Sequence, residues 1–315
     1  MSIRVENGVP RPSSLPPLPA DWSVEWGSFQ SPDGKCAIYE TCLHRNDWSS
    51  PRALIVLHGY GEHLGRYYHL PAFLKSQFDS IWLMDIRGHG RSEGARGHVD
   101  RFDAFVDDFE AFILRVDEKL KAKFGKSELF VLGHSFGGHI LIRTLLLKQD
   151  LPIRAAIASA PFLKIKQAVP FAKKLGAQLL THIWGSLQMD AGAEPTLLSH
   201  DPEIAECYTS DRLVHAKMTP KFFSELQWAM KDTLTHEVGL QHPILFIVPG
   251  SDGVTDQDVV QEWVKNFKHR EKKVKVFPEF FHEPMNEIGK EAVFAEICDW
   301  VQEHSAGSAG NTGTG

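Results

Sequence analysis

The sequence lacks the features that mark several large classes of protein. Its 315 residues include only four cysteines, and these show neither a Cys-x-x-Cys pair nor a metal-binding spacing: Cys36, Cys42, Cys207 and Cys298. We therefore expect reduced, structural thiols. No apolar run approaches the length of a membrane span, and the first residues lack the apolar core of a signal peptide. These absences predict a cytoplasmic protein.

Positive charge is not in excess either. Lysine and arginine number 34 against 40 aspartate and glutamate residues, and the resulting net charge of −6 argues against a nucleic-acid partner. Neither the P-loop nor the Rossmann glycine spacing occurs, so the glycine-rich loop at 85–92 is interpreted as a structural turn. We expect no cofactor and no metal. With 43% hydrophobic residues, the chain can bury a large core.

Short apolar runs alternate with helical patterns along most of the chain. Residues 22–44 alternate between apolar and polar around Ser31-Pro32-Asp33-Gly34, which predicts an antiparallel hairpin. We then expect buried strands at 53–57, 81–85, 129–132, 155–160, 244–248 and 274–277. The helical patterns between them lie at 67–78, 102–120, 140–147, 259–267 and 288–301. This order predicts an α/β protein with a mostly parallel, doubly wound sheet.

Residues 162–241 interrupt the alternation. They contain helical patterns, including an apolar face from Val169 to Ile183, and no convincing strand. A helical stretch of about eighty residues is too long for a connection and is interpreted as a cap, or lid. The predicted division is an N-terminal arm at 1–20, a core at 21–161 and 242–304, the cap at 162–241, and a disordered tail at 305–315.

A nucleophile motif stands between a predicted strand and a predicted helix. Gly133-His134-Ser135-Phe136-Gly137 matches G-x-S-x-G, which in this context is typical of a nucleophile elbow. The tight turn needs small residues two positions before and after the serine. It also leaves the amide of Phe136 at the start of a helix, where backbone N–H groups favour an oxyanion. The alternative is a glycine-rich turn that only joins strand to helix.

A serine nucleophile needs a base, and a neutral imidazole needs a carboxylate to fix its tautomer. Asp252 and His282 each follow a predicted strand and stand in the chain order serine, acid, histidine. Asp256 is a rival acid, but it directly precedes a helical pattern and is interpreted as an N-cap. The second oxyanion amide is assigned to Tyr60, in the glycine-containing loop at 58–63. We interpret His58 and His134, which flank these motifs, as structural.

Several segments together resemble the monoacylglycerol lipase and lysophospholipase branch of the α/β-hydrolases. They are the motif HGYGEHLGRY at 58–67, GHGRSEG at 88–94, GHSFGG at 133–138, Asp252 and His282. The resemblance implies an α/β-hydrolase fold with a helical cap over an apolar acyl tunnel, and cofactor-free ester hydrolysis. It places the catalytic triad on Ser135, Asp252 and His282, and the oxyanion amides on Tyr60 and Phe136.

The resemblance also implies a polar end of the pocket that holds glycerol. It places Glu62 and Arg66 there and, through the similarity of residues 208–211 to the cap of these lipases, Tyr208. Tyr60 replaces the small residue that is common in the family, and we expect it to narrow the site. The alternative for Glu62 and Arg66 is that they pair with each other and brace the loop.

We therefore expect a serine esterase or lipase that cleaves carboxylic esters of lipids through an acyl-serine intermediate. Monoacylglycerol, giving fatty acid and glycerol, is the expected substrate. The alternatives are a lysophospholipase, a broad short-chain carboxylesterase or thioesterase, peptide hydrolysis on the same triad, and a binding protein that retained the fold. The apolar cap face predicts either transient, peripheral contact with a membrane surface or packing on the core. The sequence leaves the oligomeric state open.

Overall fold

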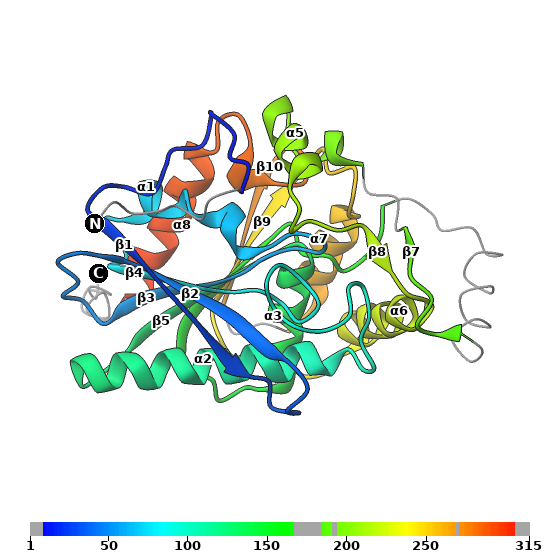
Figure 1. Cartoon of the computed structure of the whole chain (residues 1–315), viewed down its shortest axis with the longest axis horizontal. Coiled ribbons are helices and arrows are strands. Elements are labelled where there is room, and N and C mark those ends of the chain that lie inside the picture. Colours follow the sequence, from blue (N-terminus) through cyan, green and yellow to red (C-terminus); the bar gives the residue numbers. More distant parts are fainter. Residues whose placement is uncertain (1–8, 167–183, 191–193, 269–270, 306–315) are drawn as a thin grey trace, which may run out of the picture.

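A single large sheet organises the molecule. The computed structural model describes residues 9–166, 184–190, 194–268 and 271–305. Eight strands are hydrogen-bonded in the order β1-β2-β4-β3-β5-β6-β9-β10 (Figure 1). Their bounds are β1 Trp22–Gln30, β2 Ala37–Arg45, β3 Arg52–Leu57, β4 Ser80–Met84, β5 Glu128–His134, β6 Ile153–Ser159, β9 Ile244–Pro249 and β10 Lys272–Phe277. β2 runs antiparallel to β1 and β4, and all the other neighbours are parallel.

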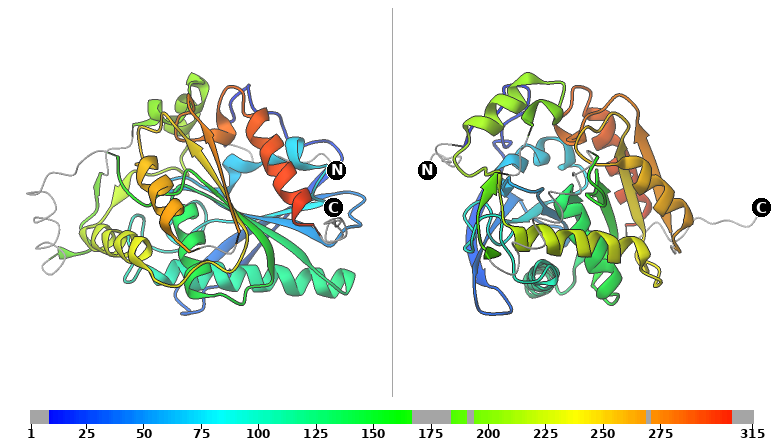
Figure 2. Two further views of the ribbon diagram at one scale, coloured as in Figure 1. Left: turned by 180° about the vertical axis from the view of Figure 1, so that it is seen from behind. Right: turned by 90° about the vertical axis from the view of Figure 1, so that its right-hand side faces the viewer.

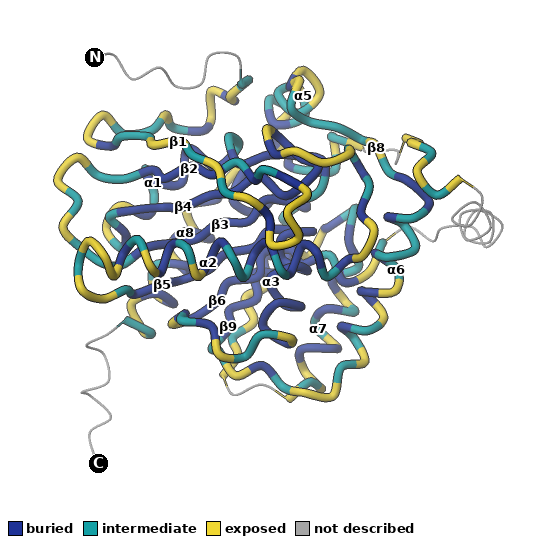
Figure 3. The backbone as a smooth tube through the Cα atoms, turned by 60° about the horizontal axis from the view of Figure 1, so that its bottom comes forward, coloured by how far each residue is buried: buried dark blue, intermediate teal, exposed yellow. Residues whose placement is uncertain are grey.

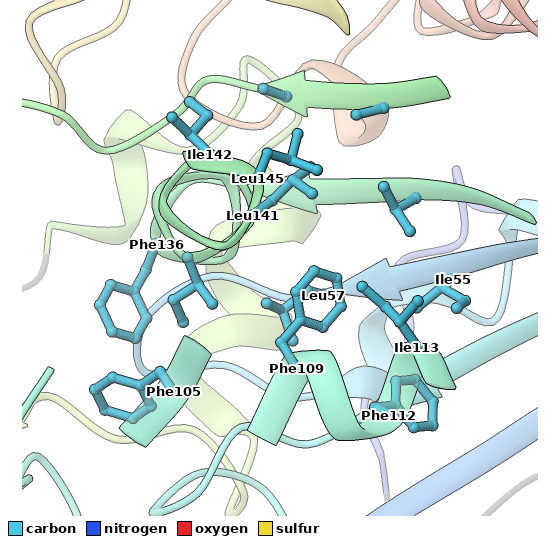
Figure 4. Close-up of a cluster of buried hydrophobic side chains, with 14 of the residues drawn as sticks. Ile55, Leu57, Phe105, Phe109, Phe112, Ile113, Phe136, Leu141, Ile142 and Leu145 are labelled. Atoms are coloured by element: carbon cyan, nitrogen blue, oxygen red, sulfur yellow. The ribbon is translucent and has the colours of Figure 1, made fainter. Parts of the chain in front are cut away.

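Helices cover both faces of the sheet, because alternate residues of the central strands point to opposite sides. Ile55 and Leu57 of β3 pack with α2 (Asp103–Phe124) and α3 (Phe136–Leu147), as Figure 4 shows. Leu54 and Val56 pack with the opposite layer, formed by α1 (Leu70–Leu74) and α8 (Glu291–Glu303). The central strands β3, β4, β5, β6 and β9 form the buried centre of the molecule, and exposed residues lie on the outer faces of the helices and on the edge strands (Figure 3). The predicted doubly wound α/β fold is confirmed.

Two predicted helices are shorter than expected. The helix at 67–78 is instead a 3₁₀ turn, η1 (Leu64–Tyr67), followed by the five-residue α1. Pro71 lies in the first turn of α1, and a proline is accepted there but not in a helix interior. The helix expected from residue 288 begins at Glu291, because Gly289 has a φ of +86° that does not belong to a right-handed helix.

The described residues between β6 and β9 form a layer at one end of the molecule (Figures 1 and 2). Phe222, Leu226 and Met230 of this layer pack into the main hydrophobic core. It contains η2 (Pro195–Leu197), α5 (Pro202–Ser210), α6 (Pro220–Thr235) and two short strands, β7 (Met189–Asp190) and β8 (Lys217–Met218). The expectation of no strand here was wrong, because a two-residue strand is too short to show an alternating pattern. The apolar face from Val169 to Ile183 lies outside the described residues. The exact cap boundaries stay a prediction.

The described part of the N-terminal arm lies against this layer. Leu15 is buried, and the Ser13 hydroxyl donates to Glu203 Oε1 of α5 at 2.8 Å. The remaining elements are α7 (Gln257–Asn266) and η3 (Pro284–Asn286). All four cysteines are free, as expected. Within the described ranges, no helix is both long and apolar enough to cross a membrane.

Candidate active site

The nucleophile elbow joins β5 to α3 and holds Ser135 in strained backbone geometry. Ser135 has φ 52° and ψ −113°, a positive φ that is rare for residues other than glycine. A Cβ on Gly133 would lie 2.4 Å from the carbonyl oxygen of Gly137, and one on Gly137 would lie 2.4 Å from the carbonyl oxygen of His58. The two glycines are therefore required by backbone contacts, as the elbow motif predicts.

The structure brings Ser135, His282 and Asp252 together in one hydrogen-bonded chain. His282 Nε2 lies 2.8 Å from Ser135 Oγ, and His282 Nδ1 lies 2.9 Å from Asp252 Oδ2. All three residues are buried, and they come from the loops that follow β5, β10 and β9. With Nδ1–H donating to the carboxylate, Nε2 is free to accept the proton of the serine hydroxyl. This is the geometry of a base poised to activate a nucleophile.

Asp252 is held as a carboxylate by its own loop. Its Oδ1 accepts the backbone N–H groups of Val254 and Thr255 at 2.8 and 2.9 Å, and its Oδ2 accepts the Thr255 hydroxyl at 2.6 Å. Burial opposes ionisation, but the neighbouring His282 and these hydrogen bonds outweigh it and lower the pKa of Asp252 to about 2. Burial likewise opposes the charged imidazole, yet Asp252 raises the pKa of His282 above its usual 6.5.

Asp256, the rival acid, serves a different purpose. It is the N-cap of α7, accepts the backbone N–H of Val259, and pairs with Lys164 Nζ at 3.0 Å. The N-cap interpretation is confirmed.

The loop after β3 lies directly against the elbow. A Cβ on Gly59 would lie 3.4 Å from Ser135 Cβ, so the backbone beside Tyr60 is close to the nucleophile. Phe136 opens α3, where the first amides have no partner within the helix. The backbone next to both proposed oxyanion amides, those of Tyr60 and Phe136, therefore lies beside Ser135, and their role stays a prediction. The Tyr60 ring meets the Phe136 ring edge-on at a centroid distance of 5.7 Å, and its hydroxyl donates to the Lys217 carbonyl of β8.

The three residues expected at the glycerol end also gather beside this loop. Glu62 Oε1 accepts the Gly59 N–H at 2.5 Å and the Tyr67 hydroxyl at 2.7 Å, and its Oε2 accepts from Arg66. The Arg66 guanidinium lies 5.2 Å from the centre of the Tyr208 ring. Both Glu62 oxygens are engaged by the protein, which favours the alternative that this pair braces the loop. A role in contacting the head group stays a prediction.

His58 and the glycine-rich loop make structural hydrogen bonds, as expected, and the structural role of His134 stays a prediction. His58 Nδ1 donates to the Gly59 carbonyl at 2.7 Å, while its Nε2 accepts the Ile86 N–H at 2.9 Å. Asp85 accepts the backbone N–H groups of Leu64 and Arg91 at 2.8 and 2.7 Å. The part of the chain that the structure describes holds no cluster of three His, Cys, Asp or Glu side chains able to bind a metal.

The sequence analysis missed one buried carboxylate in this region. Glu283 follows His282 and forms a bidentate ion pair with Arg66, at 2.7 and 2.8 Å. The only local signal was an acidic residue next to the candidate base. Its partner lies 217 positions away in the chain, and no pattern of spacing indicates such a contact.

Comparison with known proteins gives relatives along almost the whole chain. The monoglyceride lipase of Homo sapiens is 28% identical over 272 residues, which cover 85% of this chain and 88% of the relative. The phospholipase YtpA of Bacillus subtilis is 27% identical over 251 residues, covering 78% and 95%. The crystal structure of a monoacylglycerol lipase from Paleococcus ferrophilus superposes with a TM-score of 0.70 at 26% identity, covering 90% of this chain and 100% of that chain.

These relatives confirm the resemblance to the monoacylglycerol lipase and lysophospholipase branch, and with it the α/β-hydrolase fold. A family model described as serine aminopeptidase, S33 (Hydrolase_4), matches residues 49–289. Because this match spans well over half of the chain, the protein belongs to the Hydrolase_4 family of α/β-hydrolases.

Proposed function

We propose that this protein is a serine ester hydrolase that cleaves monoacylglycerol into fatty acid and glycerol. The observation that carries the proposal is the hydrogen-bonded chain from Ser135 through His282 to Asp252 at a strained elbow. The human relative, named a monoglyceride lipase, supports the choice of substrate.

The reaction proceeds in two steps. His282 takes the hydroxyl proton as Ser135 Oγ attacks the ester carbonyl, and the amides of Tyr60 and Phe136 stabilise the oxyanion. His282 then protonates the leaving alcohol, which departs and leaves an acyl-serine. A water molecule, deprotonated by the same imidazole, attacks the acyl group. His282 returns the proton to Ser135 Oγ as the bond to the acyl group breaks and the fatty acid leaves. Asp252 keeps His282 in the required tautomer and stabilises its charged form.

The charge beside the site favours a neutral head group. Two carboxylates, Glu62 and Glu283, share a single guanidinium, that of Arg66, and all three side chains are at most 10% exposed. The cluster therefore carries a net negative charge. A phosphate placed beside it would lose solvation and meet repulsion, whereas a diol would lose little. Lysophospholipase activity is the alternative that the relative named phospholipase YtpA supports.

A substrate panel tests the proposal. Monoacylglycerol, lysophosphatidylcholine and a p-nitrophenyl ester of the same acyl chain are compared by kcat/KM, together with an acyl-CoA and an aminoacyl p-nitroanilide. We expect monoacylglycerol to be preferred, with binding that strengthens by about 0.8 kcal/mol for each CH₂ until the acyl site is full. A clear preference for lysophosphatidylcholine, the thioester or the anilide would overturn the substrate assignment.

The predicted head-group contacts are tested on the same panel. Contact with the head group predicts that Glu62→Ala and Tyr208→Phe lower kcat/KM for monoacylglycerol more than for the p-nitrophenyl ester. The Tyr208 hydroxyl would lie 3.1 Å from a Cβ on Gly61, so it borders the loop that carries Glu62. Equal losses on both substrates would show that these residues brace the loop and do not contact the alcohol.

Contact of the cap with a lipid surface also belongs to the proposal. Trp184 and Met189 are 62% and 38% exposed in the described part of the cap, and large apolar side chains on a surface favour an acyl-rich environment. Co-sedimentation with anionic vesicles at low salt measures this contact. Protein that stays in the supernatant would show that the cap does not contact the vesicle surface.

A further inference from the structure

Glu283 is a buried carboxylate with defined partners on both sides. Its side chain is 5% exposed. Arg66 donates from Nη1 to Oε1 at 2.7 Å and from Nη2 to Oε2 at 2.8 Å. Asn286 Nδ2 donates to Oε2 at 2.7 Å, and the backbone N–H of Glu283 donates to the Leu198 carbonyl at 2.8 Å. The carboxylate therefore fixes its own loop, which also carries His282, to the guanidinium of Arg66.

Arg66 connects this loop to the one that carries the proposed oxyanion amide. The guanidinium also donates to Glu62 Oε2, and Glu62 Oε1 accepts the N–H of Gly59 at 2.5 Å. Gly59 directly precedes Tyr60. An unbroken chain of hydrogen bonds thus runs from the backbone beside the oxyanion amide, through Glu62, Arg66 and Glu283, to the residue after His282.

The three side chains of this hydrogen-bonded series are all ionised. Burial alone would suppress the charge of Arg66, but Glu283 and Glu62 outweigh it and raise the pKa of the guanidinium further. Burial would raise the pKa of Glu283, and Arg66 lowers it. The His134 ring, 5.2 Å from the His282 ring, stays neutral because burial lowers the pKa of His134 to about 4. His282 therefore lies beside a cluster with a net charge of about −1, which favours its imidazolium form.

We propose that Glu283 is a positioning residue for the ester hydrolysis, an inference that rests on the proposed function. Through Arg66 and Glu62 it fixes the position of His282 relative to the oxyanion amide of Tyr60. The base and the oxyanion donor must keep their relative position to within about 0.5 Å during reaction, and here both lie on loops and not on rigid elements. The ion pairs between Glu62, Arg66 and Glu283 hold the two loops in a fixed relative position.

Glu283→Gln tests the inference. Arg66 keeps Glu62 as a counter-ion in this variant, so the buried guanidinium is not left unpaired. On a soluble p-nitrophenyl ester we expect kcat to fall by about 10- to 100-fold, while KM stays within about twofold. Because a negative charge is lost beside His282, the acidic limb of the kcat/KM profile should move to lower pH.

Glu40→Gln is the matched control. The Glu40 side chain is 4% exposed and pairs with Arg115 and Lys119 of α2, away from the site. Removing its charge perturbs the ion pairs of an equally buried carboxylate, whose cationic partners are more exposed than Arg66. Both kcat and the pH profile should stay at the wild-type values.

Glu283→Asp separates geometry from charge and replaces the first variant if that one does not fold. It keeps the charge but withdraws the carboxylate by one methylene, so kcat should fall while the acidic limb stays in place. Wild-type kcat in a folded Glu283 variant, or a change in KM alone, would overturn the positioning role. A wild-type protein that hydrolyses no ester would instead refute the proposed function.

Discussion

Replacing Asp252 by asparagine keeps the size of the side chain but removes its charge, and the site cannot accommodate the amide in either orientation. If the NH₂ group takes the place of Oδ2, it faces His282 Nδ1 at 2.9 Å, donor against donor. The imidazole must then carry its proton on Nε2, where it can no longer accept the proton of Ser135. If the NH₂ group takes the place of Oδ1, it faces the backbone N–H groups of Val254 and Thr255, at 2.8 and 2.9 Å.

We therefore expect Asp252→Asn to lower kcat by about 10³- to 10⁴-fold, which corresponds to about 4–5.5 kcal/mol of transition-state stabilisation. The hydrogen bonds that are lost should also reduce the free energy of unfolding by about 1–3 kcal/mol. The assay measures kcat on a p-nitrophenyl ester, with urea unfolding in parallel.

Asp256→Asn is the control for this prediction. The substitution changes only the N-cap of α7 and the ion pair with Lys164. We therefore expect wild-type kcat and a decrease of about 1 kcal/mol or less in the free energy of unfolding. A larger loss of kcat in Asp256→Asn than in Asp252→Asn would refute the assignment of the acid. A loss below about tenfold in Asp252→Asn would refute the tautomer argument.

Two further predictions concern the elbow and the base. In Gly137→Ala the new Cβ would meet the carbonyl oxygens of His58 and Leu57 at 2.4 and 2.5 Å, so activity should be lost together with about 1–3 kcal/mol of unfolding free energy. Gly125→Ala is the control, because Gly125 has φ +73° and a Cβ there would meet no neighbouring atom. We expect this variant to lose only about 1 kcal/mol through backbone strain. Equal activities of the two variants would contradict the packing argument. For the wild-type protein, kcat/KM should fall on the acid side with an inflection above pH 6.5, because His282 has a raised pKa and must be neutral to accept a proton. An inflection below pH 6.5 would contradict the pairing with Asp252.

Sequence patterns predicted the central strands, most of the helices and the nucleophile elbow, because each depends on residues that are close together in the chain. Buried parallel strands and their helices are visible as apolar runs and helical spacing, and the elbow glycines follow from the tight turn. The wrong helix bounds and the missed strands have causes that apolar periodicity does not show. Pro71 starts α1 anew after the 3₁₀ turn η1, and the positive φ of Gly289 delays the start of α8. The strand pair β7–β8 is too short to produce a pattern.

The candidate site likewise has residues that the sequence could place and a contact that it could not. Ser135, Asp252 and His282 could be placed because chain order and strand ends restrict where a triad can form. The link from Arg66 to Glu283 could not, since it joins residues 217 positions apart and depends on how two loops meet in three dimensions. The sequence left open whether Glu62 and Arg66 pair with each other, and only the structure shows that Arg66 also pairs with Glu283.

The central claim is that Ser135 is the nucleophile of an ester hydrolase. Fatty acid release from monoacylglycerol by the wild-type protein and by Ser135→Ala measures it directly, with a fluorophosphonate probe to locate the reactive serine. We expect the substitution to lower the rate at least about a thousandfold without unfolding the protein, and the probe to label Ser135 alone. Activity that survives in the folded variant, or labelling of another serine, would contradict the claim.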